Sequence, residues 1–147
     1  MIRPAQARDV AAWAAMRLQL WPDADPIELA REAAQFVAGV KQPALDAALV
    51  YEHDAAPVGF VELSIRPFAD GCDAMPIPYV EAWFVEESAR GRGIGRALLD
   101  AGERWARERG FTEIGSDTEL HNVGSQRAHA ACGYAEVERQ VKFRKAL

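Results

Sequence analysis

Residues 90–95 combine glycine and arginine in a pattern that suits a bound anion. They are Arg90, Gly91, Arg92, Gly93, Ile94 and Gly95. Alternating glycines let a backbone turn tightly and approach a ligand closely. The free N–H groups at the start of a following helix, together with the helix dipole, attract negative charge. Arg96 adds another cation nearby. The segment therefore predicts a binding site for a pyrophosphate group.

Two other glycine-rich motifs are excluded by the residues around this loop. A P-loop requires Gly-Lys followed by Ser or Thr, and the sequence contains no such triplet. A dinucleotide fingerprint requires Gly-x-Gly-x-x-Gly, but its last position falls here on Arg96 or Leu98. A plain turn into a helix needs only one glycine. The repeated glycines therefore favour a ligand over a simple turn.

Two carboxylates lie in the strands expected on either side of the loop. Glu81 belongs to the expected strand 79–85, and Asp117 ends the expected strand 111–118. A carboxylate near an amine can bind its cationic form and accept its proton. Asp117 is the first candidate for a general base, with Glu81 as its partner in amine binding. Asp also commonly serves in turns and caps, and Glu81 could face outward, so these interpretations stay open.

The elements around these residues predict an α/β fold with a mixed sheet covered by helices. Apolar spacing, caps and glycine stops define the elements. We expect helices at 9–20, 25–39, 94–109 and 122–132, and strands at 2–4, 47–51, 58–65, 79–85, 111–118 and 134–143. Because strands and helices alternate over a length typical of one domain, residues 1–147 are expected to form a single domain.

Composition limits the classes of function. The formal net charge of −5 argues against nucleic-acid binding and suits a cationic small molecule. No apolar run approaches the ~18 residues of a membrane span. The N-terminus lacks the features of a secretory signal, so a cytoplasmic protein is expected. Cys72 and Cys132 have neither CxxC spacing nor clustered histidines, and no metal site is predicted.

The loop and its surroundings resemble the GNAT superfamily of N-acetyltransferases. Residues 90–95 match the Arg/Gln-x-x-Gly-x-Gly/Ala signature of that family, between an aromatic strand and a long helix. Asn122, Ala128 and the pair Gly133-Tyr134 are similar to the segment that flanks the coenzyme in the family. The resemblance follows the element order of the whole chain. It implies the GNAT fold and acetyl-coenzyme A as the acetyl donor.

The resemblance also implies which residues hold the coenzyme. The strand at residues 83–85 would part from its neighbour and pair with the pantetheine arm. His129 stands where many members have a tyrosine, and it could protonate the leaving thiolate or merely line the arm. The implied coenzyme residues are Trp83, Phe84, Val85, Arg90, Gly91, Arg92, Gly93, Ile94, Gly95, Arg96, Asn122 and His129.

Segments outside the loop are similar to one subgroup, the aminoglycoside 6′-N-acetyltransferases. They include residues 19–22, 71–73, 80–85, 116–118 and 144–145. The subgroup implies an aminoglycoside acceptor, antibiotic resistance and a homodimer with residues 136–143 at its interface. The expected acceptor residues are Trp21, Asp23, Asp73, Tyr79, Glu81, Asp117 and Glu119.

Two alternatives remain from the sequence. An enzyme of the same fold could act on another small amine, a polyamine or a peptide, since acidic residues around a cleft fit them all. A non-catalytic module that binds acetyl-coenzyme A would keep the loop without needing Asp117 or Glu81. Only measured turnover separates these from the aminoglycoside hypothesis.

Overall fold

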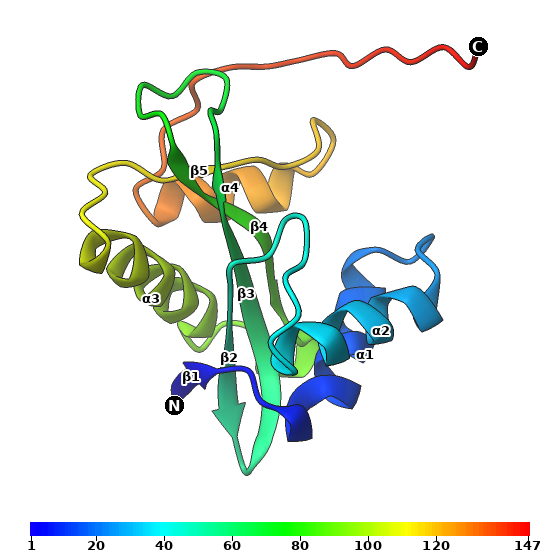
Figure 1. Ribbon diagram of the computed structural model, residues 1–147. Coiled ribbons are helices and arrows are strands. Elements are labelled where there is room, and N and C mark those ends of the chain that lie inside the picture. Colours follow the sequence, from blue (N-terminus) through cyan, green and yellow to red (C-terminus); the bar gives the residue numbers. More distant parts are fainter.

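The computed structural model describes residues 1–147 and is built on a five-stranded sheet with the order β1-β2-β3-β4-β5 (Figure 1). The strands are β1 (Ile2–Pro4), β2 (Ala47–His53), β3 (Ala56–Arg66), β4 (Ile77–Val85) and β5 (Gly115–Ser116). Neighbouring strands from β1 to β4 are antiparallel, whereas β5 runs parallel to β4. The mixed α/β sheet expected from the sequence is confirmed.

Helices cover both faces of this sheet (Figure 1). They are α1 (Val10–Leu20), α2 (Pro26–Val37), α3 (Ile94–Glu108) and α4 (Val123–Ala131), with short 3₁₀ turns at Ala7–Asp9 and Glu87–Ala89. The pair α1 and α2 packs on one face, and α3 packs on the other. None of these helices combines the length and the apolar character needed to cross a bilayer.

Strand β3 supplies side chains to both layers of the core. Phe60 packs with Trp13 and Met16 beneath α1. Val61 packs with Leu98 beneath α3. Because alternate residues of a strand face opposite sides of a sheet, this long apolar strand joins the two layers. All five side chains are almost completely buried.

The helix boundaries follow from the capping signals in the sequence. Asp25 accepts a hydrogen bond from the N–H of Ile27 at 2.9 Å and caps α2. Asn122 accepts one from the N–H of Ser125 at 3.0 Å and caps α4. Gly110 follows α3 with a φ of 86°, a conformation that favours glycine. The expected helices are confirmed with boundary shifts of a few residues.

Two expected strands differ in the structure. Only Gly115–Ser116 of the expected strand 111–118 pairs with β4. Residues 134–143, expected as a last strand, form none, and the C-terminal segment is extended (Figure 1). A strand needs a neighbour to satisfy its backbone groups, and within one chain the two-residue β5 offers no partner for ten residues of the tail. The strand expected at 134–143 is therefore wrong for the isolated chain.

Candidate active site

A cleft of about 790 Å³ opens where β4 and the chain beyond β5 separate. These strands pair only at Tyr79–Gly115 and Val80–Ser116, and β4 then continues to Val85. The expected site residues that line the cleft are Trp21, Glu81, Trp83, Phe84, Val85, Arg90, Gly91, Gly93, Ile94, Gly95, Asp117, Glu119, Asn122 and His129. The fold therefore brings the glycine loop and the two carboxylates to one space.

A β-bulge shapes the wall of the cleft at Glu81. Opposite β3, Val80 pairs with Leu63 and Ala82 pairs with Glu62, which leaves Glu81 as the extra residue. Consequently Val80 packs beneath α3, whereas Ala82 packs beneath α1. In a regular strand, two residues separated by one position would face the same side of the sheet. Bulges bend a strand and re-aim its side chains. This one places the Glu81 side chain at the cleft.

The glycine loop presents free backbone donors to the cleft. Gly91 and Gly93 have φ angles of 76° and 77°, and a Cβ atom on either would meet no atom within 4 Å. The backbone hydrogen bonds of α3 begin with the N–H of Ala97, which donates to the carbonyl oxygen of Gly93 at 3.0 Å. The N–H groups before it, in the first turn, have no helical acceptor. The residues present therefore fit an anionic pyrophosphate group.

Trp83 and His129 form a rigid side of the cleft. The indole N–H of Trp83 donates to the carbonyl oxygen of Gly95 at 3.0 Å, and its ring lies edge-on to His129 with centroids 5.1 Å apart. His129 Nδ1 is 2.7 Å from the carbonyl oxygen of Ser125, which can only accept, so Nδ1 carries a proton. His129 Nε2 is 2.8 Å from the hydroxyl of Ser116. Both ring nitrogens are thus engaged within the protein.

Asp117 lines the cleft as an exposed carboxylate. Its Oδ2 accepts a hydrogen bond from the hydroxyl of Tyr79 at 2.8 Å, and no hydrogen bond is made to Oδ1. Burial, followed by this hydrogen bond to Asp117, raises the pKa of Tyr79 well above its usual value. Tyr79 therefore stays protonated and keeps donating, and Asp117 retains one oxygen for a further partner.

Glu81 has a different environment. Its Oε1 accepts hydrogen bonds from Ser64 Oγ at 2.5 Å and Arg66 Nε at 2.7 Å, and its Oε2 accepts one from Arg66 Nη2 at 2.8 Å. The pair with Arg66 is bidentate, the geometry in which arginine binds carboxylates most strongly. Both oxygens of Glu81 are therefore occupied, whereas Asp117 keeps one free.

Some expected site residues do not line the cleft: Asp23, Asp73, Tyr79, Arg92 and Arg96. Arg96 donates to the carbonyl oxygen of Ala131 at the end of α4 and points away from the loop. Asp73 lies on the loop before β4, where its N–H donates to Glu113. Asp23 lies in the turn between α1 and α2. Tyr79 reaches the site only through Asp117.

Trp21, at the end of α1, is held by a buried arginine. The guanidinium carbon of Arg17 lies 5.3 Å from the centroid of a Trp21 ring. Arg17 also donates to Glu62 on β3 at 2.8 Å, and to the carbonyl oxygen of Leu29 and the carboxylate of Glu32 on α2 at 2.9 and 3.1 Å. Arg17 therefore links the sheet, α2 and the outer wall of the cleft.

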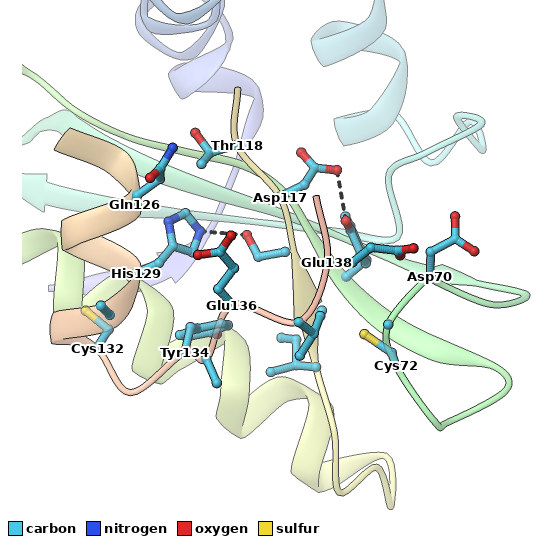
Figure 2. Close-up of a pocket in the computed structure, with 18 of the residues that line it drawn as sticks. Asp70, Cys72, Asp117, Thr118, Gln126, His129, Cys132, Tyr134, Glu136 and Glu138 are labelled. Atoms are coloured by element: carbon cyan, nitrogen blue, oxygen red, sulfur yellow. Dashed lines mark hydrogen bonds between the residues drawn. The ribbon is translucent and has the colours of Figure 1, made fainter. Parts of the chain in front are cut away.

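A second cavity of about 580 Å³ lies on the other side of residues 116–118, which line both spaces. Figure 2 shows the C-terminal segment, with Glu136 and Glu138, beside His129 and Asp117 in this cavity. Acidic side chains predominate among its charged residues: Asp70, Glu103, Glu113, Asp117, Glu136 and Glu138, against one arginine, Arg139. The space next to Asp117 thus favours a cation.

Three residues that support the site were missed by sequence reasoning. They are Arg17, Arg66 and Ser116, which hold Trp21, Glu81 and His129. One signal was available for Arg66, since a glutamate within an expected strand needs a partner. Arg17 and Ser116 act through contacts between distant segments, and local sequence carries no sign of these.

The sequence and the fold are similar to those of known acetyltransferases. Residues 10–134 match the model of the Acetyltransferase (GNAT) family. An aminoglycoside N(6′)-acetyltransferase type 1 of Klebsiella aerogenes is 44% identical, with 100% of this chain and 97% of that protein covered. One of Stenotrophomonas maltophilia is 40% identical, with coverages of 99% and 93%. The structure of AAC(6′)-Iy in complex with the bisubstrate analogue CoA-S-monomethyl-acetylneamine superposes with a TM-score of 0.89 at 32% identity, covering 100% of this chain and 98% of that one.

Proposed function

This chain belongs to the GNAT family of acetyltransferases, and we propose that it transfers acetyl from acetyl-coenzyme A to the 6′-amine of aminoglycosides, conferring resistance. One observation carries the proposal: a single cleft joins the donors of the glycine loop to the free carboxylate of Asp117. Relatives that bear the aminoglycoside acetyltransferase name match along the whole chain.

The glycine loop and β4 hold the donor. When bound, acetyl-coenzyme A supplies an activated acetyl thioester. The N–H groups at the start of α3 bind its pyrophosphate, and Gly91 and Gly93 allow the close approach. The edge of β4 at residues 83–85, which has no partner strand beyond Val80, would hold the pantetheine arm, and a backbone N–H there would polarise the thioester carbonyl. His129 lines the arm and does not serve as a proton donor, because both its nitrogens are engaged.

Asp117 binds the acceptor amine and takes its proton. An ammonium group is held by the free oxygen of Asp117, and the same carboxylate accepts a proton from the attacking nitrogen, directly or through water. Glu81 does not serve as the base, since Arg66 occupies both its oxygens. Trp21 and Glu119, which line the outer part of the cleft, bind the sugar rings.

The test of this function is the release of coenzyme A thiol from acetyl-coenzyme A in the presence of kanamycin. An aminoglycoside with a hydroxyl at the 6′ position is the matched control. Turnover with kanamycin alone supports acetylation of the 6′-amine. Turnover only with polyamines or peptides would assign another acceptor to the same fold. Tight binding of acetyl-coenzyme A without any product would leave a coenzyme-binding module.

Replacing Trp21 with alanine is expected to raise the KM for kanamycin by about tenfold, the size of a partly desolvated cation–π contact. The KM for acetyl-coenzyme A stays unchanged, because Trp21 follows α1 and is not among the residues assigned to the coenzyme. Steady-state kinetics with each substrate varied in turn measures both values. Trp105→Ala is the control, since Trp105 is also half-buried and stacked by an arginine, Arg109, but lies on α3 away from the cleft. Equal effects of the two substitutions would reject acceptor binding by Trp21.

The exposed C-terminal segment supports a homodimer. Val141 and Phe143 are 72% and 92% exposed, and residues 136–143 are extended without a partner strand. We assign this segment to an interface between two copies of the chain, in the cytoplasm, where acetyl-coenzyme A is available. The net charge of −5 argues against a nucleic-acid partner.

Truncation after Arg139 is expected to convert the dimer to a monomer, because it removes Val141 and Phe143. Light scattering would then give the mass of a single truncated chain, where the full-length protein gives twice its chain mass of 16.2 kDa. Phe68→Ser, which changes an exposed phenylalanine elsewhere, leaves the mass unchanged. A full-length monomer, or a truncated protein that remains dimeric, would rule out this interface.

A further inference from the structure

Arg66, the last residue of β3, contacts two residues expected in the site. Its Nε and Nη2 donate to the two oxygens of Glu81 at 2.7 and 2.8 Å. Its guanidinium carbon lies 3.6 Å from the centroid of the Tyr79 ring. The planar group therefore stacks on an aromatic ring while its edge binds a carboxylate, an arrangement that lysine does not reproduce.

Tyr79 extends this chain of contacts to Asp117. The tyrosine ring is buried and its hydroxyl donates to Asp117 Oδ2 at 2.8 Å. At the other end, Ser64 Oγ donates to Glu81 at 2.5 Å. The order of contacts is thus Ser64, Glu81, Arg66, Tyr79 and Asp117. Each member except Asp117 is fixed by its neighbours on β3 and β4.

We propose that Arg66 is a positioning residue for the acetyl transfer, which sets the orientation of Asp117 by stacking on the ring of Tyr79, whose hydroxyl binds Asp117. This inference rests on the proposed role of Asp117 and adds a residue that does not itself touch substrate. Arg66 also neutralises Glu81, so that Asp117 is the unpaired carboxylate that meets the ammonium group. Without Arg66, the charge of Glu81 would compete for the same cation.

The fold does not require this ion pair. Strands β3 and β4 pair over their full length, from Gly59–Val85 to Arg66–Ile77. The Arg66 and Glu81 side chains are 38% and 14% exposed, and the backbone ladder joins the two strands on both sides of this partly buried pair. The short contacts of Arg66 therefore serve the geometry of the site more than the stability of the sheet.

The test compares Arg66→Met, Tyr79→Phe and the double variant in the kanamycin assay. Arg66→Met is expected to lower kcat by about ten- to hundredfold, the cost of a misplaced catalytic group, and to leave the KM for acetyl-coenzyme A unchanged. Because Arg66 acts through Tyr79, the double variant loses no more activity than the more damaged single variant. Losses that multiply in the double variant would overturn positioning through Tyr79.

Two controls separate this inference from other causes. Arg31→Met removes another bidentate Arg–Glu contact, with Glu28 on the exposed face of α2, and is expected to retain full activity. Arg66→Lys keeps the charge and guards against misfolding of Arg66→Met; we expect a lower kcat because lysine cannot stack and bind both oxygens. Full kcat in a folded Arg66→Met or Arg66→Lys protein would overturn the inference. Wild-type protein inactive on kanamycin would instead overturn the proposed function.

Discussion

Asp117→Asn is expected to lower kcat for kanamycin by about a hundredfold or more, the usual contribution of a general base. Asparagine has nearly the same shape, and its carbonyl oxygen can still accept the hydrogen bond from Tyr79. The substitution therefore removes the negative charge and the proton acceptor while the local geometry is kept. Single-turnover measurements at saturating acetyl-coenzyme A report the chemical step directly.

Asp70→Asn provides the comparison for Asp117→Asn. Asp70 lines the neighbouring cavity and accepts a hydrogen bond from Gln140 at 2.7 Å, so it carries the same charge outside the acetyl-transfer cleft. Its substitution is expected to leave kcat unchanged. If Asp117→Asn is folded and its kcat falls by less than about threefold, the base is another group.

Gly93→Val is expected to weaken the binding of acetyl-coenzyme A by about ten- to hundredfold, from the cost of a strained backbone conformation. Gly93 has a φ of 77°, which a β-branched residue rarely adopts. A side chain there would occupy the open space in front of the N–H groups of α3. Isothermal titration with acetyl-coenzyme A measures the change in Kd.

Gly110→Val separates loss of the ligand site from loss of stability. Gly110 has a φ of 86° and open space at its Cβ position, but it lies at the opposite end of α3. Both substitutions are expected to lower the melting temperature, and only Gly93→Val is expected to change the Kd. An unaltered Kd for Gly93→Val would contradict the assignment of the loop to the pyrophosphate.

Much of the fold was predictable because its signals are local. Asp25 caps a helix, Gly110 ends one, and Gly91 and Gly93 occupy positions with positive φ angles. The apolar spacing of α3 and the β-branched and aromatic residues of β4 were also sufficient to assign these elements. Such features depend on neighbours within a few residues, and sequence reasoning recovers them.

The last strand was not predictable in the same way. Residues 134–143 have the composition of a strand, but a strand forms only where another backbone completes its hydrogen bonds. Whether that backbone is present depends on the edge that β5 offers, which is only two residues long. A second copy of the chain would change that condition, which is why the truncation experiment is informative for the fold as well as for assembly.

The sequence predicted which residues form the site better than it predicted the role of each residue. Asp117 and Glu81 do line one cleft. Their difference depends on Arg66 and Tyr79, which contact them from other positions of the sheet. Strand register decides those contacts, and the β4 register shifts at the bulge. Composition and spacing alone could not place the guanidinium on Glu81.

The bulge in β4 also constrains how a chain of this kind can evolve. Beyond it, Trp83 packs toward α3 and Phe84 toward α1. If the ladder became regular with Glu81 kept in place, residues 82–85 would slip by one position against β3, these two aromatic side chains would exchange layers, and the cleft would lose its tryptophan wall. Surface loops accept insertions and deletions freely. In β4, one residue added or removed away from the bulge would instead move every side chain beyond it to the other face of the sheet.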